Sequence, residues 1–199
     1  VQGLLDWMAI PYTGEGSRTS LVAFDKGLAK MAYRQSEIPV ASDIILSKRQ
    51  IAHLLHGVAK ASENSAEELL SAQVPLSYPV FIKPTSEGSS VGVSRVDNAS
   101  ELLVALAALQ HVDVIIEDLV TGPEISVVCV GQECLGSVEI EPLREFYDYE
   151  AKYGHAGTAY HVPPRLDDAT IEEAEAIGLA AHLALDCIGV TRSDLIIGP

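Results

Sequence analysis

The stretch that most constrains the fold is residues 79–96, PVFIKPTSEGSSVGVSRV. Its apolar start, Pro79–Lys83, predicts a short buried strand, and the alternation of Val91–Val96 predicts a second strand. The connecting loop is rich in Gly and Ser, and small residues let backbone N–H groups point at an anion. Lys83 supplies a compact positive charge just before that loop. Together these features are suited to binding a phosphate group.

A second interpretation stays open from these residues alone, because a Gly-rich loop is weak support for any particular ligand. The same stretch also fits a polar hairpin with an exposed lysine. It does not match the Walker pattern, since no Gly-Lys-Ser or Gly-Lys-Thr opens a helix here.

Composition narrows the class of protein. With 199 residues, of which 48% are apolar, the chain can bury a sizeable core in one or two globular domains. Its formal net charge of -15 argues against a general role in binding nucleic acid or a membrane surface. The sequence shows no signal peptide and no apolar run of about 18 residues that could cross a membrane.

The three cysteines are odd in number and lack the spacing of a metal site. Cys129 and Cys187 lie in apolar runs and are predicted to be small core residues. This cysteine usage is typical of a reducing, cytoplasmic setting.

Helical periodicity and capping signals predict most of the helices. These are residues 2–9, 17–24, 26–35, one or two helices within 47–72 with a break at 62–65, and 98–110. The last helix is predicted to begin at a capping box, Thr170 to Glu173, and to end at Gly189. Its predicted buried stripe is Ile177, Ala181, Ala184, Leu185 and Ile188.

Further strands are predicted at residues 41–46, 112–117, 125–130, 133–140 and 190–197. The strands at 125–130 and 133–140 form a hairpin through Gly131 and Gln132. Phe146–Tyr160 combines aromatic, charged and small residues, which is typical of a mobile loop that closes over a ligand.

Several charged residues have two interpretations each. Lys26 is either a solvated surface lysine or a second cation near the phosphate loop. Glu117 is either an ordinary carboxylate at a strand end or an acceptor for ribose hydroxyls, with apolar Leu119 and Val120 beside it to contact the base.

Arg192 and Asp194 share one face of the last predicted strand, because side chains alternate along a strand. An arginine and a carboxylate aimed together suit a phosphate with a Mg²⁺ ion, since Asp binds Mg²⁺ and Arg stabilises the charge of a transferring group. A simple ion pair is the alternative.

Five features occur in order along the chain: Lys26, IKPTSEGSSVGVSRV, IIEDLVTGPEISV, FYDYEAKY and VTRSDL. Together they resemble the D-alanine–D-alanine ligases, ATP-grasp enzymes of bacterial cell-wall synthesis. The resemblance covers essentially the whole chain. It implies an α+β fold, the ATP-grasp fold, in which two α+β subdomains grip ATP.

The resemblance also implies roles for single residues. Lys26 and Lys83 match the lysines that contact the ATP phosphates, and Glu124 matches the ribose acceptor. Arg192 matches an arginine near the acyl phosphate and the tetrahedral intermediate, and Asp194 matches a magnesium ligand. The remaining matches are Glu87, Gly88, Ser89 and Ser90 in the phosphate-covering loop, Glu117, Leu119 and Val120 in the adenine and ribose pocket, and Lys152 and Tyr153 in the closing loop.

The activity implied is ATP-dependent, ADP-forming ligation of two D-alanines for peptidoglycan precursors, through an acyl phosphate. Within it, Ser89, Tyr153 and Arg192 are the implied catalytic residues, and Tyr153 favours dipeptide over depsipeptide formation. The implied cofactors are ATP and Mg²⁺ or Mn²⁺. D-alanine is the implied substrate, a homodimer is the implied assembly, and no nucleic acid or membrane partner is expected.

The resemblance further predicts that the chain is a piece of a longer ligase, incomplete at both ends. Residues 1–25 would end an N-terminal substrate domain with its linker, 26–120 would form the central subdomain and 121–199 a truncated C-terminal subdomain. A Glu-x-Asn supplying further magnesium ligands would lie beyond Pro199, so this piece alone is expected to have little turnover. Ser193 stands where the family usually has an apolar residue.

Two other functions stay open at this point. One is a different ATP-grasp ligase that joins a carboxylate to an amine. The other is a nucleotide-binding remnant without catalytic activity.

Overall fold

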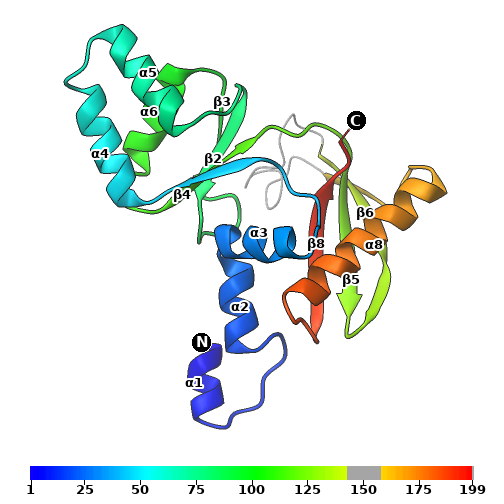
Figure 1. Ribbon diagram of the computed structural model, residues 1–199. Helices are drawn as coiled ribbons and strands as arrows, with labels where there is room; N and C mark the ends of the chain where they lie inside the picture. Colours follow the sequence, from blue (N-terminus) through cyan, green and yellow to red (C-terminus); the bar gives the residue numbers. More distant parts are fainter. Residues whose placement is uncertain (143–157, 199) are drawn as a thin grey trace. The chain divides into compact units, whose positions relative to one another are not determined.

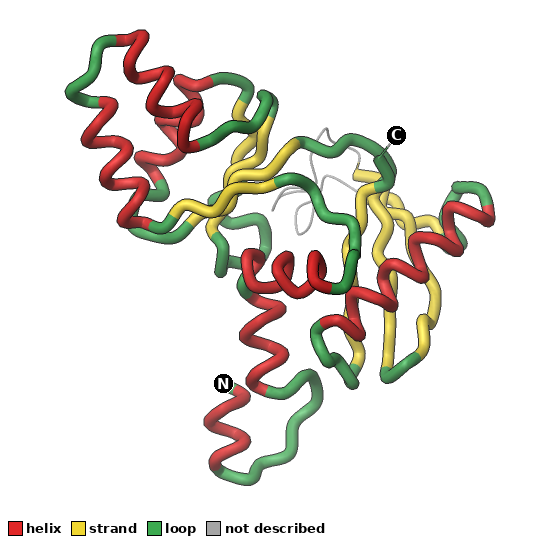
Figure 2. The backbone as a smooth tube through the Cα atoms, viewed as in Figure 1, coloured by secondary structure: helices red, strands yellow, loops and turns green. Residues whose placement is uncertain are grey.

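The computed structural model describes residues 1–142 and 158–198. It divides into two compact units, Ala41–Leu119, and Val1–Val40 together with Val120–Pro199. Each unit is built on one four-stranded antiparallel sheet, shown as yellow tube in Figure 2. Within the described ranges, no helix combines the length and the apolar character that a membrane span needs.

The sheet of Ala41–Leu119, called sheet A here, has the order β1 (Asp43–Leu46), β4 (Val114–Asp118), β2 (Val80–Pro84) and β3 (Ser94–Val96). All neighbouring strands run antiparallel. In the register of β2 and β4, Phe81 lies opposite Glu117 and Lys83 lies opposite Ile115. These four side chains therefore share one face of sheet A.

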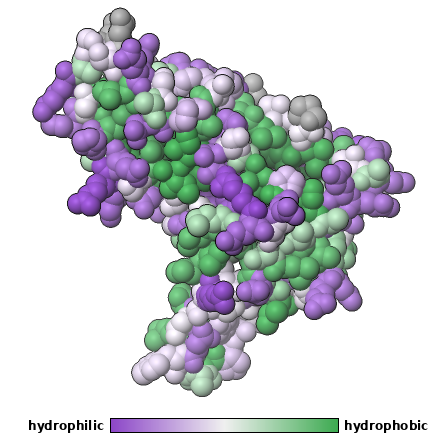
Figure 3. Space-filling view, viewed as in Figure 1, coloured by the Kyte–Doolittle hydropathy of each residue, from purple (hydrophilic) through white to green (hydrophobic). Residues whose placement is uncertain are grey.

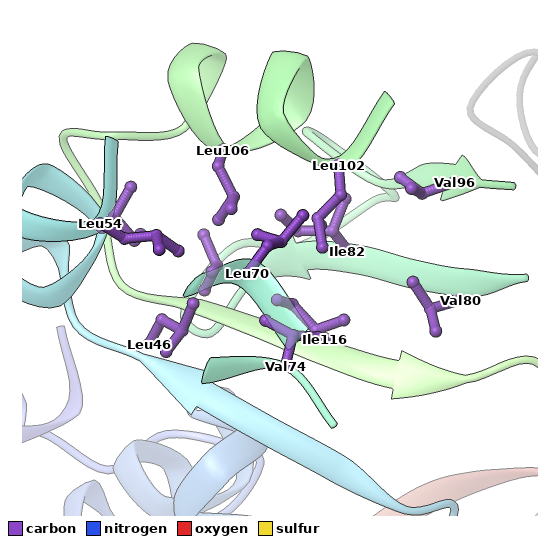
Figure 4. Packing of buried hydrophobic residues seen from close by; sticks show 12 residues of the cluster. Leu46, Leu54, Leu70, Val74, Val80, Ile82, Val96, Leu102, Leu106 and Ile116 are labelled. Carbon is purple, nitrogen blue, oxygen red and sulfur yellow. The ribbon is translucent and has the colours of Figure 1, made fainter. Parts of the chain in front are cut away.

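Three helices pack on the other face of sheet A: α4 (Lys48–Val58), α5 (Glu63–Gln73) and α6 (Ala99–Ala108) (Figure 1). Figure 4 shows Leu102 and Leu106 of α6 pointing at Ile82 and its neighbours on the sheet. The buried cluster is Leu46, Ile51, Leu54, Leu70, Val74, Val80, Ile82, Val96, Leu102, Leu106, Val114 and Ile116. Because strand residues alternate, the apolar half of sheet A faces the helices and Lys83 and Glu117 belong to the opposite face.

The second sheet, called sheet B here, has the order β7 (Thr158–His161), β6 (Glu133–Pro142), β5 (Glu124–Val130) and β8 (Val190–Ile196). Helix α8 (Asp168–Ala184) runs along the face formed by Ile125, Val127 and Cys129 (Figure 1). Gly178 allows a close approach, since a Cβ there would lie 2.5 Å from Val127 Cγ1.

Three more helices precede sheet A in the chain: α1 (Gln2–Trp7), α2 (Ser17–Phe24) and α3 (Lys26–Gln35). Asp25 caps α3 by accepting a hydrogen bond from Leu28 N–H at 3.0 Å, and α3 contacts α8. Apolar and polar side chains are interspersed on the surface over α1 and α2 (Figure 3), where Trp7 is 83% exposed.

Gly122 is required by the turn that leads into β5. Its φ of +154° is a conformation that L side chains rarely adopt, and a Cβ there would collide with the carbonyl oxygen of Ile197. The same turn accepts a hydrogen bond from Ile197 N–H at Pro123 O, over 2.9 Å. The chain beyond β8 is thus joined to the start of β5.

Most predicted elements are confirmed, including both strands of the hairpin at residues 125–140. The second strand of the opening stretch is shorter than predicted and begins only at Ser94, because Ser89, Ser90 and Gly92 have positive φ and keep the chain turning. Thr158–Tyr160, predicted as loop, belong to β7.

The predicted capping box of α8 is wrong. The cap is Asp167, whose carboxylate accepts from Thr170 N–H at 3.0 Å and from the Thr170 hydroxyl at 2.8 Å. The helix also ends at Ala184, before Gly189. Because the helical period stops there, Ile188 is 79% exposed instead of buried. The residues that α8 buries are Ala174, Gly178, Ala181 and His182.

Candidate functional site

In sheet A, the predicted cation is paired with a predicted carboxylate. Lys83 on β2 and Glu117 on β4 lie on the same face, and the Lys83 ammonium forms an ion pair with Glu117 Oε2. Glu117 is 8% exposed, so its charge is balanced by the lysine within a largely dry setting. The structure thus brings together two residues that were predicted from separate segments.

The loop after Lys83 has an unusual backbone. Ser89 and Ser90 are consecutive non-glycine residues with positive φ, +53° and +58°. Such a conformation costs roughly 1–3 kcal/mol for each residue and is found at ligand-binding loops. A hydrogen bond from Val91 N–H to Gly88 O, over 3.1 Å, closes the turn that contains these two residues. Glu87, Gly88 and Ser89 are exposed.

Lys26 occupies the first position of α3, directly after the Asp25 cap, and is partly buried. The positive charge of a lysine is unfavourable at the N-terminus of a helix, which is the positive end of the helix dipole. An anion bound there would be attracted by both the lysine and the helix N-terminus. The position of Lys26 is therefore compatible with its predicted role.

In sheet B, Arg192 and Asp194 lie on the same face of β8, as predicted, and contact each other at 2.9 Å from Nη2 to Oδ2. The simple ion pair that the sequence left open is thus present. Asp194 Oδ1 accepts a second hydrogen bond, from the Ser126 hydroxyl at 2.6 Å. Ser126 and Asp194 are direct partners in the register of β5 and β8.

Glu124 begins β5 and belongs to the same face as Ser126, because the two residues are two positions apart on one strand. This face is opposite to the one that packs against α8. Along the chain, the division between the two units falls between Leu119 and Val120, the two residues that were predicted to contact adenine.

The fit of a magnesium ion can be judged from Asp194. Among the described residues, no three His, Cys, Asp or Glu side chains gather into a group that could hold a metal. Mg²⁺ is commonly bound through one or two carboxylates together with the phosphates of a substrate. One half-exposed carboxylate, held from one side by a buried hydroxyl, fits that mode of binding.

Lys152 and Tyr153 lie outside the described residues, so their predicted roles are not addressed by the structure.

Sequence reasoning missed a polar cluster on the α8 face of sheet B. Glu139, 8% exposed, accepts hydrogen bonds from Arg165 N–H at 2.8 Å, Nε at 3.1 Å and Nη2 at 2.7 Å. Arg165 also pairs with Glu141, which contacts His161 at 2.9 Å. Hydrogen bonds from Arg165 lower the pKa of Glu139 to about 2. This cluster joins β6 to β7 and the turn that follows β7.

His182 was missed as well. It is 2% exposed, and its ring contacts the Thr191 hydroxyl at 2.6 Å through Nδ1 and the Gly131 carbonyl at 2.9 Å through Nε2. A neutral ring with Nε2–H donating to the carbonyl and Nδ1 accepting from Thr191 satisfies both contacts. His182 thereby fixes α8 to the residue just before Arg192.

The cysteines are buried as predicted at two positions. Burial raises the pKa of the Cys129 thiol to about 11, and burial beside Glu15 and Asp186 does the same for Cys187. Both thiols are therefore neutral at physiological pH and act as apolar core groups.

Comparison with known proteins decides the family. The model of a family described as "D-ala D-ala ligase C-terminus" matches residues 46–199. The chain belongs to this family. A D-alanine–D-alanine ligase from Anaeromyxobacter sp. (strain Fw109-5) is 38% identical over 201 residues, which cover 100% of this chain and 60% of that protein.

Solved structures agree with this family. A D-alanine–D-alanine ligase from Bacillus anthracis is 30% identical with a TM-score of 0.74, covering 99% of this chain and 60% of that one. A D-Ala:D-Ser ligase from Enterococcus faecalis is 28% identical with a TM-score of 0.78, covering 100% of this chain and 55% of that one. These likenesses confirm the predicted α+β ATP-grasp fold.

A further structure of the Bacillus anthracis ligase, solved with ATP, is 27% identical with a TM-score of 0.71, covering 98% of this chain and 59% of that one. The chain thus spans 55% to 60% of the length of these ligase-family proteins.

Proposed function

We propose that these residues are the ATP-binding part of a ligase that joins two D-alanines into D-alanyl-D-alanine for peptidoglycan synthesis. The family and the names of the relatives as D-alanine–D-alanine ligases support this proposal, and the relative solved with ATP supports the nucleotide. We also propose the domain limits predicted above, with 26–120 and 121–199 as the two ATP-grasp subdomains and 1–25 as the end of a substrate domain.

The observation that carries the proposal is common to both sheets. In each, the face opposite to the packed helices holds a cation paired with a carboxylate, Lys83 with Glu117 in sheet A and Arg192 with Asp194 in sheet B. None of these four charged residues belongs to the apolar clusters described under the helices. These charged pairs lie outside the apolar cores, and the loop that follows Lys83 in the chain has two left-handed serines; both features support a polyanionic ligand.

In the proposed reaction, ATP phosphorylates the carboxylate of one D-alanine, and the amine of the second attacks the acyl phosphate and displaces phosphate. Lys26, Lys83 and the N–H groups of Ser89 and Ser90 bind the triphosphate. Arg192 stabilises the charge that develops on the phosphoryl group and on the tetrahedral intermediate.

The other residues bind the rest of the nucleotide and the metal. Glu124 accepts the ribose hydroxyls, Glu117, Leu119 and Val120 surround adenine, and Glu87 and Gly88 complete the phosphate loop. Asp194 holds a Mg²⁺ or Mn²⁺ ion, which would neutralise phosphate charge when bound. Lys152 and Tyr153 are proposed to close the site beside Ser89. The homodimer implied by the resemblance and the cytoplasmic setting indicated by the cysteines belong to the same proposal.

The first experiment measures ATP binding by the 199-residue chain in the presence of Mg²⁺. We expect Lys83→Ala to raise the Kd for ATP by about 10-fold or more, because a hydrogen bond to a charged group contributes about 1.5–3 kcal/mol. Lys60→Ala is the matched control, since Lys60 is an exposed lysine at the end of the α4 region, and it should leave the Kd unchanged. Absence of ATP binding, or equal effects of the two substitutions, would refute the proposal.

A second experiment concerns the substrate and needs a chain of the full length of the relatives. Phosphate release with ATP and D-alanine should be rapid in that protein and slight in the 199 residues alone. D-serine offered as the second amino acid tests the activity named for the Enterococcus faecalis relative. Turnover with D-serine, or with amino acids other than D-alanine, at a rate above that with D-alanine would assign another ligase activity.

A further inference from the structure

The Asp194 carboxylate is held at both oxygens, by one buried group and one exposed group. Oδ1 accepts a 2.6 Å hydrogen bond from Ser126, a short side chain on the neighbouring strand that is 4% exposed. Oδ2 contacts the guanidinium of Arg192 at 2.9 Å, and the Arg192 side chain is 58% exposed.

The two contacts therefore differ in strength and in how readily they are exchanged. The Ser126 hydroxyl is fixed by the pairing of β5 with β8 and is held out of water, where a hydrogen bond to a charged group is strong. An ion pair between exposed side chains contributes little, because water and salt screen it. Oδ1 is thus the anchored oxygen of Asp194, and Oδ2 is the oxygen whose partner can change.

We propose that Ser126 is a positioning residue that aims the Asp194 carboxylate, and that a divalent cation replaces Arg192 at Oδ2. This inference rests on the proposed function, in which Asp194 is a metal ligand. Asp194 would then serve as an oxygen ligand of the kind a divalent cation prefers, and Arg192 would lose a partner that it holds only through a solvent-screened pair. Arg192 is then free to donate its planar set of N–H groups to a phosphoryl group. One carboxylate would thereby couple metal binding to the release of the arginine.

The test of the Ser126 role is the Mn²⁺ concentration needed for half-maximal ATP binding by the 199-residue chain. We expect Ser126→Ala to raise that concentration about 10-fold, since removing an outer partner of a metal ligand typically costs about 10–100-fold in metal affinity. Metal-free ATP binding and the melting temperature are measured in parallel. Ser126→Thr keeps the hydroxyl and should restore the wild-type Mn²⁺ requirement.

Ser193→Ala is the matched control, because Ser193 lies next to Asp194 on β8 but belongs to the α8 face. It should leave the Mn²⁺ requirement unchanged. An unchanged Mn²⁺ requirement in Ser126→Ala would overturn the inference, and so would an equal loss of ATP affinity with and without Mn²⁺. If the wild-type chain binds no ATP at any Mn²⁺ concentration, the proposed function fails instead.

The exchange of partners at Oδ2 is measured by NMR, through the Nε–H resonance of Arg192. This resonance is assigned by its disappearance in the Arg192→Lys variant. It should move when Mg²⁺ is added to the ATP complex. In Asp194→Asn, which weakens the pair, the resonance should already be in the displaced position without Mg²⁺. A resonance at the same position with and without Mg²⁺ would overturn the exchange.

Discussion

Sheets A and B each have helices packed on one face, yet the residues beneath those helices differ in kind. Between sheet A and helices α4, α5 and α6 lies a cluster of twelve buried apolar residues, contributed by both the strands and the helices. Between sheet B and α8 the apolar cluster has four buried residues, and the buried polar groups there are Ser137 and Glu139 of β6 and His182 of α8. Ser137 donates to Glu175 of α8 at 2.7 Å.

The comparison shows two ways of fixing a sheet that carries a candidate site on its opposite face. Sheet A is stabilised mainly by removing apolar surface from water, which is insensitive to pH. Sheet B relies in part on hydrogen bonds whose loss leaves buried groups unsatisfied. Acid, and the replacement of buried polar residues, should therefore lower the stability of the unit that contains sheet B. Truncation of buried apolar side chains should lower the stability of the unit that contains sheet A.

The largest expected effect is that of Leu102→Ala in α6. Leu102 is fully buried, so truncation should lower the free energy of unfolding of its unit by about 3 kcal/mol. Hydrogen exchange, read separately from peptides of each sheet, measures the change. Val104→Ala on the same helix is the control, because Val104 is 72% exposed and should change stability by less than about 0.5 kcal/mol. Equal effects of the two would contradict an apolar core beneath α6.

His182→Leu should destabilise the other unit by about 2 kcal/mol, because the Gly131 carbonyl and the Thr191 hydroxyl lose their partner. His56→Leu in α4 is the matched control, since His56 is exposed, and it should be nearly neutral. Hydrogen exchange in β8 and α8 gives the measurement. A neutral His182→Leu would show that apolar packing alone is sufficient under α8.

Acid should weaken the unit of sheet B through Glu139. Its pKa is lowered from 4.5 to about 2 by Arg165, so the folded state favours the ionised form more than the unfolded state does. The resulting stability is fully present above pH 4.5 and is lost as pH falls toward 2. Glu139→Gln should cost about 1.5 kcal/mol at neutral pH.

The measurement is hydrogen exchange in β6 and β7 of both proteins at several pH values between 2 and 6. The difference between wild type and Glu139→Gln should shrink as pH falls through this range. A difference that does not depend on pH would show that the ionised Glu139 contributes no stability.

The smallest effects come from one substitution made in both units. Gly178→Ala should destabilise by about 1 kcal/mol, because the new Cβ would lie 2.5 Å from Val127 and this overpacking exceeds the gain in helix propensity. Gly57→Ala in α4 meets only an ordinary contact at 3.7 Å and should stabilise by about 0.5–1 kcal/mol. Thermal unfolding of both variants decides the signs, and Gly178→Ala with Val127→Ala should recover part of the loss.

The sequence predicted which face a charged residue belongs to, because alternation along a strand is local. It could therefore place Arg192 and Asp194 together. It could not predict that Ser126, 68 positions away in the sequence, donates a hydrogen bond to Asp194. Nor could it predict that Lys83 pairs with Glu117. Such partners depend on strand order and register, which are set by packing over the whole unit.

Local signals also competed where the prediction was wrong. Both Asp167 and Thr170 can cap a helix, and the pattern of Thr followed by Glu favoured Thr170. In the structure the earlier residue is the cap and Thr170 itself donates to Asp167. Strand β7 was missed because its four residues carry little pattern and are ordered by pairing with β6.

Gly122 has a consequence for how this chain can diverge. Gly122 is exposed to solvent, and exposed positions ordinarily tolerate substitution by many amino acids. Here the direction that any side chain would take leads into the backbone of Ile197, so exposure does not confer tolerance. Sequence drift in the exposed turn is therefore limited by backbone that lies 75 residues further along the chain.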